Sequence, residues 1–388
     1  MIPVSILTNT YDFIGTKSND KYYGYKLALL LFLLACFFST PNVFLFFLQD
    51  NLSSAWNTVI FKSNNLTSSL SHIDPYSWQA KKVFRLTIPL LIKLFNLPPY
   101  IIVLLQIFVG YLIFLFSYKL AFRISKDSIQ ATFFTAGIAF LYFGKASFFE
   151  FKATWFDGFS YFFIIMAMWS RGVLGIIIFS TLAAWNDERG FMALSLVFLF
   201  HYFDNIGLEK ISFRNFLNFK KNTIAVFAAI FFYIVGRLIM SNLYNMHTPN
   251  DGANLGVLLD RTYYFIPIGL LTFFEGFYFL LAVFILFMVK SKDYLRLSFV
   301  AVPLLLITIV SFCVTDITRS GAFAFPIVFI SIYYLKDKLA ETQMRAILLI
   351  CCMVSILIPP IFICADWGIE RMLPKFSLFQ VLDILKTL

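Results

Sequence analysis

The stretch GVLGIIIFSTLAAWNDERGFMALSLVFLF, residues 172–200, decides the fold class of this chain. Two apolar segments flank three adjacent charged residues, Asp187, Glu188 and Arg189. Apolar runs with charge confined to the short connection between them are typical of neighbouring helices in a lipid bilayer. The stretch therefore indicates a helical membrane protein. It also raises the question of whether its charges form a plain turn or part of a site.

The composition extends this conclusion to the whole chain. Of the 388 residues, 60% are hydrophobic and only 13% are charged, and the mean hydropathy is +0.82. Soluble domains carry about 25% charged residues. The net charge of +10 is spread between apolar blocks instead of being gathered in a polar domain that could bind nucleic acid. We expect an all-α, polytopic integral membrane protein with one transmembrane domain over residues 1–388 and no nucleic-acid partner.

Eleven apolar segments approach the length of about 20 residues that a membrane-spanning helix needs. The segments at 158–170, 172–186 and 190–205 are short, which suits helices that are tilted, partly re-entrant or buried among others. Residues 365–388 follow the last segment as a short tail. The eleven predicted spans lie near residues 26–48, 100–122, 128–146, 158–170, 172–186, 190–205, 223–242, 263–289, 297–314, 321–335 and 346–364.

The distribution of charge orients the predicted spans. With the N-terminus inside, the inner connections carry 17 Lys and Arg against 8 Asp and Glu, and the outer side carries 13 against 12. This inner excess follows the positive-inside rule. The start MIPVSILTNTYDF lacks the basic residues, short apolar core and cleavage site of a signal peptide, so we expect the first apolar block to be a retained anchor. We expect a multi-pass protein of a bacterial inner membrane with a cytoplasmic N-terminus.

The first outer loop, residues 49–99, is much the longest connection. Within it, VFRLTIPLLIKLF (83–95) mixes apolar residues with Arg85 and Lys93, a pattern that favours an amphipathic helix lying in the membrane interface. Both cations could simply snorkel towards the lipid headgroups. Because the sequence indicates no soluble catalytic domain, we expect any chemistry to take place at the membrane.

The outer side differs from the inner side because its charges form clusters of mixed sign in short connections. We expect these loops to converge on one cavity, where carboxylates serve as a base or cation ligand and basic side chains hold a phosphate. The competing interpretation is that each loop is a solvated turn whose charges pair locally. The charged residues of the clusters are Asp74; Lys145, Glu150, Lys152 and Asp157; Asp187, Glu188 and Arg189; Asp260 and Arg261; and Asp316 and Arg319.

Several of these residues also have a simple structural interpretation. Asp157 could cap the helix that follows it, and Asp316 could pair with Arg319 three residues further on. Asp50, at the end of the first predicted span, could be an interfacial anchor or a catalytic base. Glu275 is the only acid deep in a predicted span, where a buried partner such as Arg237 is conceivable.

Motifs for cofactors are absent from the sequence. The three histidines, His72, His201 and His247, form no paired-ligand pattern, and the five cysteines show no CxxC spacing. No glycine-rich phosphate loop occurs either. The sequence therefore requires no cofactor, although Asp187 and Glu188 could hold a divalent cation, and the metal requirement stays open.

The layout resembles the glycosyltransferase-C superfamily, polytopic membrane enzymes that use polyprenyl-phosphate sugar donors. The shared features are a long first outer loop with an interfacial helix and acidic residues, short middle spans, and a charged non-cytoplasmic face. They cover about residues 26–210. The stretch FFEFKATWFDGFSYFFIIMAM (148–168), continued by residues 172–194, is similar to a region of bacterial members in which a connection carrying an acid and an Arg follows two apolar segments. Residues 74–94 are also similar to uncharacterised bacterial membrane proteins.

The resemblance implies inverting transfer of a sugar in cell-envelope polysaccharide biosynthesis. In that superfamily a first-loop Asp commonly acts as the base, and Asp74 and Asp50 are the matching candidates, although the usual paired-acid signature is absent here. The base would deprotonate a hydroxyl of a glycan or lipid acceptor, which attacks the anomeric carbon of the lipid-linked sugar. The donor's tail would lie among Phe-rich helices and membrane lipids. Candidates to neutralise the departing phosphate are Arg189, Lys145, Arg319 and Arg85.

Three other functions remain open on the sequence. A transporter or flippase for a polar or lipid-linked substrate would be favoured by inverted repeats and interrupted helices near the midplane. A polysaccharide polymerase or ligase would also use arginines on the outer face. A membrane acyltransferase would need a catalytic histidine, for which His72 and His247 are weak candidates. We therefore expect a glycosyltransferase, with the transporter as the main alternative.

Overall fold

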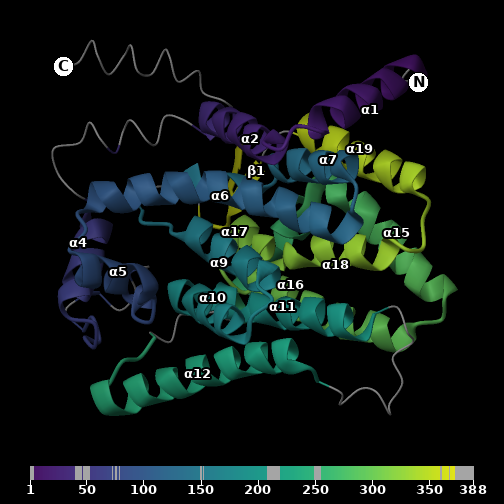
Figure 1. Ribbon diagram of the computed structural model, residues 1–388. Helices are drawn as coiled ribbons and strands as arrows, with labels where there is room; N and C mark the ends of the chain where they lie inside the picture. The colour runs from purple at the N-terminus through teal and green to yellow at the C-terminus, as the bar shows by residue number, and fades with distance from the viewer. Residues whose placement is uncertain are drawn as a thin grey trace, which may run out of the picture.

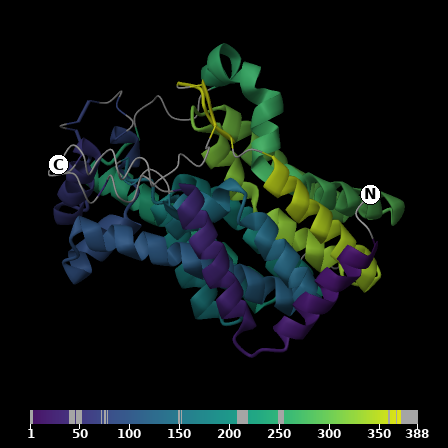
Figure 2. The same ribbon diagram turned by 90° about the horizontal axis from the view of Figure 1, so that it is seen from above.

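The computed structural model of this chain is 79% helical. Most helices lie roughly side by side in one bundle, and the helices of the long first loop pack at one end of it, on the left of Figure 1. Figure 2 views the bundle from above. The structure describes residues 4–39, 46, 53–71, 73–74, 77, 79–148, 151, 153–207, 219–248, 255–358, 361–366 and 368–371.

The first half of the chain is built from helices and short helical turns. Its elements are α1 (Val4–Ser18), α2 (Tyr23–Ser39), α4 (Ser54–Asn64), η1 (Ala80–Lys82), α5 (Thr87–Phe95), α6 (Pro99–Ser125), α7 (Ser128–Ile138), α8 (Tyr142–Lys145), η2 (Ala146–Phe148), α9 (Asp157–Trp169), α10 (Val173–Asn186) and α11 (Glu188–Ile206).

The second half adds further helices and one small hairpin. Its elements are α12 (Lys221–Tyr244), α13 (Leu255–Val257), η3 (Leu258–Thr262), η4 (Tyr263–Phe265), α14 (Ile266–Phe274), η5 (Glu275–Phe277), α15 (Tyr278–Lys290), α16 (Tyr294–Phe312), α17 (Ile317–Gly321), η6 (Ala322–Ala324), α18 (Pro326–Leu335), α19 (Glu341–Leu357), β1 (Ile361–Cys364) and β2 (Gly368–Arg371).

Five helical stretches are long and apolar enough to cross a membrane. Three shorter apolar helices, Tyr23–Cys36, Asp157–Trp169 and Val173–Asn186, accompany them. The chain therefore has the character of a membrane protein, whereas the count of eleven spans and the side on which each end lies stay predictions. The five long stretches are Pro99–Ser125, Lys221–Tyr244, Leu258–Lys290, Tyr294–Phe312 and Ile317–Leu335.

Two predicted spans are interrupted. The block at 128–146 leaves the α-helix after Ile138, and α8 begins only at Tyr142. The block at 263–289 breaks at Glu275, whose φ of 44° ends α14 before α15 begins at Tyr278. Hydropathy averages over a window, so it does not detect one residue in the left-handed region.

The expectation of an all-α chain is wrong at one place, because residues 361–371 form an antiparallel hairpin. Ile361 pairs with Arg371, and Cys364 pairs with Gly368. The last predicted span, 346–364, therefore ends early, at Leu357. Ile358 is already extended (φ −71°, ψ 121°), and the sequence continues with Pro359 and Pro360, which disfavour helix before them. The predicted interfacial helix at 83–95 is also shorter, since α5 begins at Thr87.

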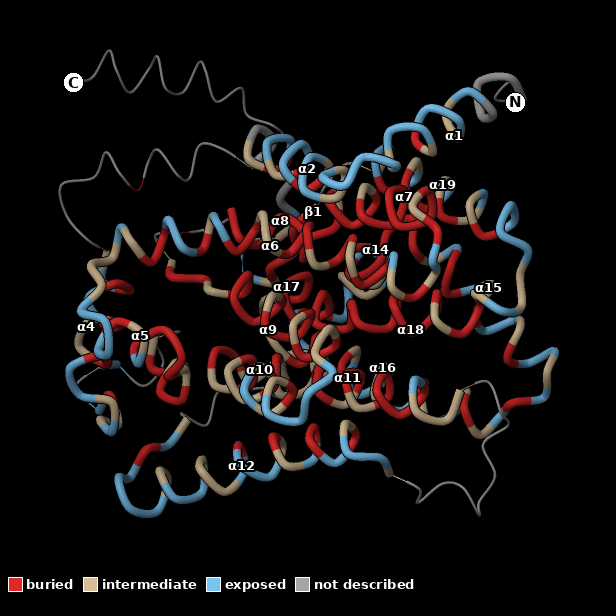
Figure 3. The backbone as a smooth tube through the Cα atoms, in the orientation of Figure 1, coloured by how far each residue is buried: buried red, intermediate tan, exposed pale blue. Residues whose placement is uncertain are grey.

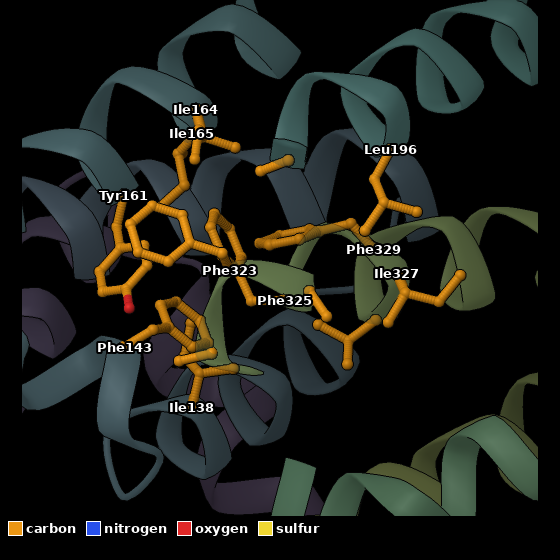
Figure 4. Close-up of a cluster of buried hydrophobic side chains, with 14 of the residues drawn as sticks. Ile138, Phe143, Tyr161, Ile164, Ile165, Leu196, Phe323, Phe325, Ile327 and Phe329 are labelled. Atoms are coloured by element: carbon orange, nitrogen blue, oxygen red, sulfur yellow. The ribbon is translucent and has the colours of Figure 1, made fainter. Parts of the chain in front are cut away.

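The hydrophobic core surrounds α17, η6 and α18. In the most apolar 18 residues of Ile317–Leu335, 94% of the residues are buried. The corresponding share in α12 is only 28%. Figure 3 shows this contrast between a buried centre and an exposed periphery. Aromatic contacts fill the centre: the rings of Phe143 and Phe325 stack at 4.5 Å, and Tyr161 lies 4.7 Å from Phe323 (Figure 4). Arg319 of α17, near the beginning of this buried stretch, forms an ion pair with Asp157.

Candidate functional site

Asp157 is the first residue of α9 and the centre of a buried ion-pair network. Its carboxylate accepts hydrogen bonds from Arg319 Nε at 2.7 Å and Nη2 at 3.0 Å, and from Arg189 Nη2 at 3.2 Å. The Tyr142 hydroxyl donates a fourth bond at 3.3 Å. Asp157 is only 1% exposed, so these partners replace the hydrogen bonds that water makes to an exposed carboxylate. Phe156, not Asp157, is the residue that precedes the helix as its N-cap.

Asp187 forms the second half of the network. It caps α11 by accepting a hydrogen bond from the Arg189 backbone N–H at 2.9 Å. Its carboxylate also accepts bonds from Arg189 Nε and Nη2, both at 2.7 Å, and forms an ion pair with Arg85 Nη1 at 2.9 Å. Burial alone raises the pKa of Asp187, but the guanidinium groups of Arg189 and Arg85 outweigh it and hold that pKa well below its usual range. Asp187 is therefore a fixed anion.

The edge of the network is formed by two less buried carboxylates. Glu188 pairs with Arg85 Nε at 3.2 Å, and Asp316 pairs with Arg319 Nη1 at 2.6 Å. Arg319 thus makes the local pair with Asp316 and the long-range pair with Asp157 at once. Its guanidinium carbon also lies 3.8 Å from the centre of the Trp155 ring. Residues from four separate predicted outer connections therefore meet in one network.

Close backbone packing brings these connections together. A side-chain carbon at Gly190 would lie 2.4 Å from the carbonyl oxygen of Ala183, so only glycine lets the start of α11 approach the end of α10 this closely. Leu86 N–H donates to the Trp185 carbonyl at 2.8 Å, and the Thr87 hydroxyl donates to the Leu182 carbonyl at 2.9 Å. These bonds attach the beginning of α5 to the end of α10 and place Arg85 beside Asp187.

A pocket opens against Arg85 and Asp187, between α4, α5 and the segment before α9. Its volume is about 450 Å³, including the open mouth. Two further cations, Lys62 and Lys82, line it together with Arg85. The complete lining is Thr58, Val59, Lys62, Leu70, Lys82, Arg85, Ile88, Pro89, Thr154, Phe156, Asn186 and Asp187.

The two lysines of the pocket are held by backbone oxygens. Lys62 is 2% exposed and its ammonium donates to the Ser68 carbonyl at 2.5 Å. Lys82 donates to the Ala153 carbonyl at 2.8 Å and to the Thr154 hydroxyl at 2.7 Å. Burial lowers the pKa of Lys62 to about 8 and lowers the pKa of Lys82 well below its ordinary value. An anion in the pocket would counter this effect by favouring both ammonium forms.

Other residues predicted for the site lie elsewhere. Asp74 is exposed, on the segment that supplies Leu70 to the pocket. Arg261 is exposed and pairs with Asp366 at 3.1 Å. Lys145 lies against a different cavity, between α2 and the turn that joins α7 to α8. Asp50, Glu150 and Lys152 are outside the described residues.

The sequence did not single out Lys62 and Lys82. Both are ordinary lysines in a polar loop, and they form no motif with each other. The helical spacing within α4 could have indicated that Trp56, Val59 and Lys62 share a buried face. Nothing in the sequence brings that face to residues 151–156, which it reaches through the hydrogen bond from the Trp56 indole N–H to the Phe151 carbonyl at 2.8 Å.

No group of three or more potential metal ligands (His, Cys, Asp or Glu) occurs among the residues that the structure describes. The buried Asp187 and Asp157 carboxylates already face guanidinium groups, which repel a cation. The donor set therefore fits an anion better than a metal. Comparison of the chain with protein-family models, with curated proteins and with solved structures gives no match.

Proposed function

We propose that this chain is a membrane glycosyltransferase that takes a sugar from a polyprenyl-phosphate donor and works at the outer face of a bacterial inner membrane. The observation that carries the proposal is the pocket beside Asp187, which Lys62 of α4 lines together with Lys82 and Arg85 from the segment before α5. Three cations in a partly enclosed pocket suit a phosphate, whose oxygens accept charge-assisted hydrogen bonds.

The position of the pocket supports a lipid-linked substrate. Ile88 and Pro89 of α5 form one wall, and Leu90 and Leu94 on the same helix are exposed, at 38% and 66%. A short apolar helix with an exposed face suits the membrane interface. A phosphate could therefore occupy the pocket while its prenyl chain remains in the bilayer.

In the proposed reaction a carboxylate takes the proton of an acceptor hydroxyl as its oxygen attacks the anomeric carbon. The bond between that carbon and the phosphate oxygen breaks, and its electron pair stays on the phosphate. Lys62, Lys82 and Arg85 stabilise the charge that develops there. Asp74 is the candidate base because it is exposed and belongs to the segment that also contributes Leu70 to the pocket wall. Asp50 is the other candidate from the sequence.

The contacts support different roles for the residues of the WNDERG connection. Four charged side chains form hydrogen bonds mainly with one another: Asp187, Arg189, Asp157 and Arg319. We assign them a structural role, which is to hold Arg85 in place through its ion pair with Asp187. Glu188 differs, because its Oε1 has no hydrogen-bond partner among the described residues. Because that oxygen is buried and Glu188 does not line the pocket, the side chain would have to turn towards the pocket to orient the acceptor hydroxyl.

The proposal is tested with the purified protein in liposomes that contain a radiolabelled polyprenyl-phosphate sugar and a lipid or glycan acceptor. Lys82→Met should reduce transfer about a hundredfold, the usual cost of removing one preorganised donor to a developing anion. Lys81→Met is the matched control, because Lys81 lies in the same η1 turn but does not line the pocket. Equal transfer by both variants and the unaltered protein would exclude this pocket.

The transporter alternative draws its support from the break at Glu275. Interrupted helices with a buried charge occur at the substrate sites of transporters, and Glu275 is 5% exposed between α14 and α15. The same liposomes distinguish the two functions when the acceptor is omitted. A transporter still moves the labelled donor across the bilayer, and Glu275→Gln should then reduce the movement.

A further inference from the structure

A second cavity lies between α2 and the turn that joins α7 to α8. Its volume is about 220 Å³, including the mouth, and it shares no lining residue with the pocket beside Asp187. The lining consists of Leu31, Leu34, Ala35, Ala139, Phe140 and Lys145. Lys145 is the only polar side chain in this lining.

The ammonium group of Lys145 is an unsatisfied donor in this cavity. Lys145 is 5% exposed, and no hydrogen-bond acceptor for it occurs among the described residues. Its Nζ lies over the face of the Phe140 ring, 5.7 Å from the ring centre. The charge of Glu275 acts on Lys145 from a distance, without forming an ion pair with it. A largely buried ammonium group that makes no hydrogen bond to the described residues favours an anionic ligand.

The mouth of the cavity faces the apolar surface of α2. Leu34 lines the cavity and is 37% exposed, and its neighbours Leu30 and Leu33 are each 55% exposed. This helix belongs to the shorter apolar helices of the chain. An exposed leucine surface of this kind is covered by lipid in a membrane, so lipid would lie beside the wall of the cavity that Leu34 forms.

We propose that this cavity binds the headgroup phosphate of an anionic membrane lipid, with the phosphate on Lys145 and the adjoining carbons against Leu34 and Phe140. Most of the roughly 220 Å³ is open space at the mouth and the enclosed part has room for about one water, so the phosphate would lie in the mouth with one oxygen reaching Lys145. A free phosphate is less suitable because the apolar lining offers its other oxygens no donor. This site is independent of the proposed glycosyl transfer, and a lipid in it would join α2 to the turn between α7 and α8.

The experiment is a titration of the full-length protein in detergent, followed by native mass spectrometry, with phosphatidylglycerol and with phosphatidylcholine of the same acyl chains. The unaltered protein should bind phosphatidylglycerol more tightly. Lys145→Met should weaken that binding about tenfold or more, as expected for the loss of a charge-assisted hydrogen bond. Lys145→Arg should retain it. Lys119→Met is the control, because Lys119 lies on α6 and bonds the Tyr25 hydroxyl of α2 without lining the cavity.

A second variant covers the case in which Lys145→Met fails to fold. Ala35→Phe fills the cavity and keeps Lys145, and it should weaken phosphatidylglycerol binding to the same extent. Unchanged binding in either variant would overturn the proposal. So would competition by millimolar inorganic phosphate, which would identify a free anion as the ligand. Glycosyl transfer is measured in a separate assay. A protein that transfers no sugar could still bind phosphatidylglycerol at Lys145, so failure of the proposed function would not contradict this lipid site.

Discussion

Arg319 and Asp157 form a two-bond ion pair, with Nε and Nη2 of the guanidinium donating to the two carboxylate oxygens, although 162 residues separate them in sequence. Their side chains are 3% and 1% exposed. This pair fixes the start of α17 against the start of α9, and with them the floor of the pocket.

Removing the charge of Asp157 should therefore destabilise the protein strongly. Asp157→Asn leaves Arg319 and Arg189 facing a neutral amide in a dry environment, and breaking a buried pair in this way costs about 3–5 kcal/mol. Thermal unfolding in detergent measures the loss. Asp316→Asn is the control, since Asp316 contacts the same Arg319 but is 28% exposed, and its loss should cost about 1 kcal/mol or less. Equal shifts for the two variants would contradict the central position of Asp157.

Arg189→Ala should reduce stability as well as activity. The guanidinium contacts Asp187, Asp157 and the Ser320 hydroxyl, so its loss leaves two buried carboxylates short of a partner. The sequence alone suggested that Arg189 is a phosphate ligand, a role that does not by itself predict a loss of stability. A fluorescence-detected gel-filtration profile decides between these views. A monodisperse Arg189→Ala protein with an unchanged melting temperature would contradict the structural role and would support the interpretation of Arg189 as a phosphate ligand.

Anion binding to the pocket should weaken as pH rises through about 8. The folded-state pKa of Lys62 is lowered by burial to about 8, so above that pH the side chain is neutral and attracts a phosphate less. Binding of a soluble prenyl-phosphate analogue at pH 7 and pH 9.5 tests this dependence. Lys62→Met should bind more weakly at pH 7 and should have a flatter profile between these two values. The same steep profile in Lys62→Met would attribute the titration to another group.

Gly190→Ala should disrupt the connection between α10 and α11. The added carbon would lie 2.4 Å from the Ala183 carbonyl oxygen, which belongs to backbone and cannot swing aside. Overpacking of this kind costs about 1–3 kcal/mol. Gly172→Ala, before α10, has nothing within 4 Å of the added carbon and serves as the control. Thermal unfolding of the two variants should differ clearly, and equal melting temperatures would mean that the helix ends separate easily.

Hydropathy predicted where the apolar helices lie, because burial in lipid or core demands long runs of apolar side chains. The charges of AAWNDERGF do find buried partners, because Arg189 pairs with Asp187 and Asp157, and Asp187 also pairs with Arg85. What hydropathy could not predict depends on single residues or on distant segments. Glu275 breaks a helix through one backbone angle, and Lys62 reaches the pocket because α4 is attached to Phe151, far along the chain, through the Trp56 hydrogen bond.

The order of the ion-pair partners along the chain also bears on how the protein enters its membrane. The stretch Ile317–Leu335 is 94% buried, and it carries Arg319 near its start. Such a segment is unfavourable in lipid before it packs on other helices, because burying an unpaired guanidinium in the bilayer costs free energy. Asp157 and Arg189 leave the ribosome more than a hundred residues earlier, so a carboxylate is already in place when Arg319 arrives. We therefore expect the later helix to be inserted against an N-terminal half that is already in place.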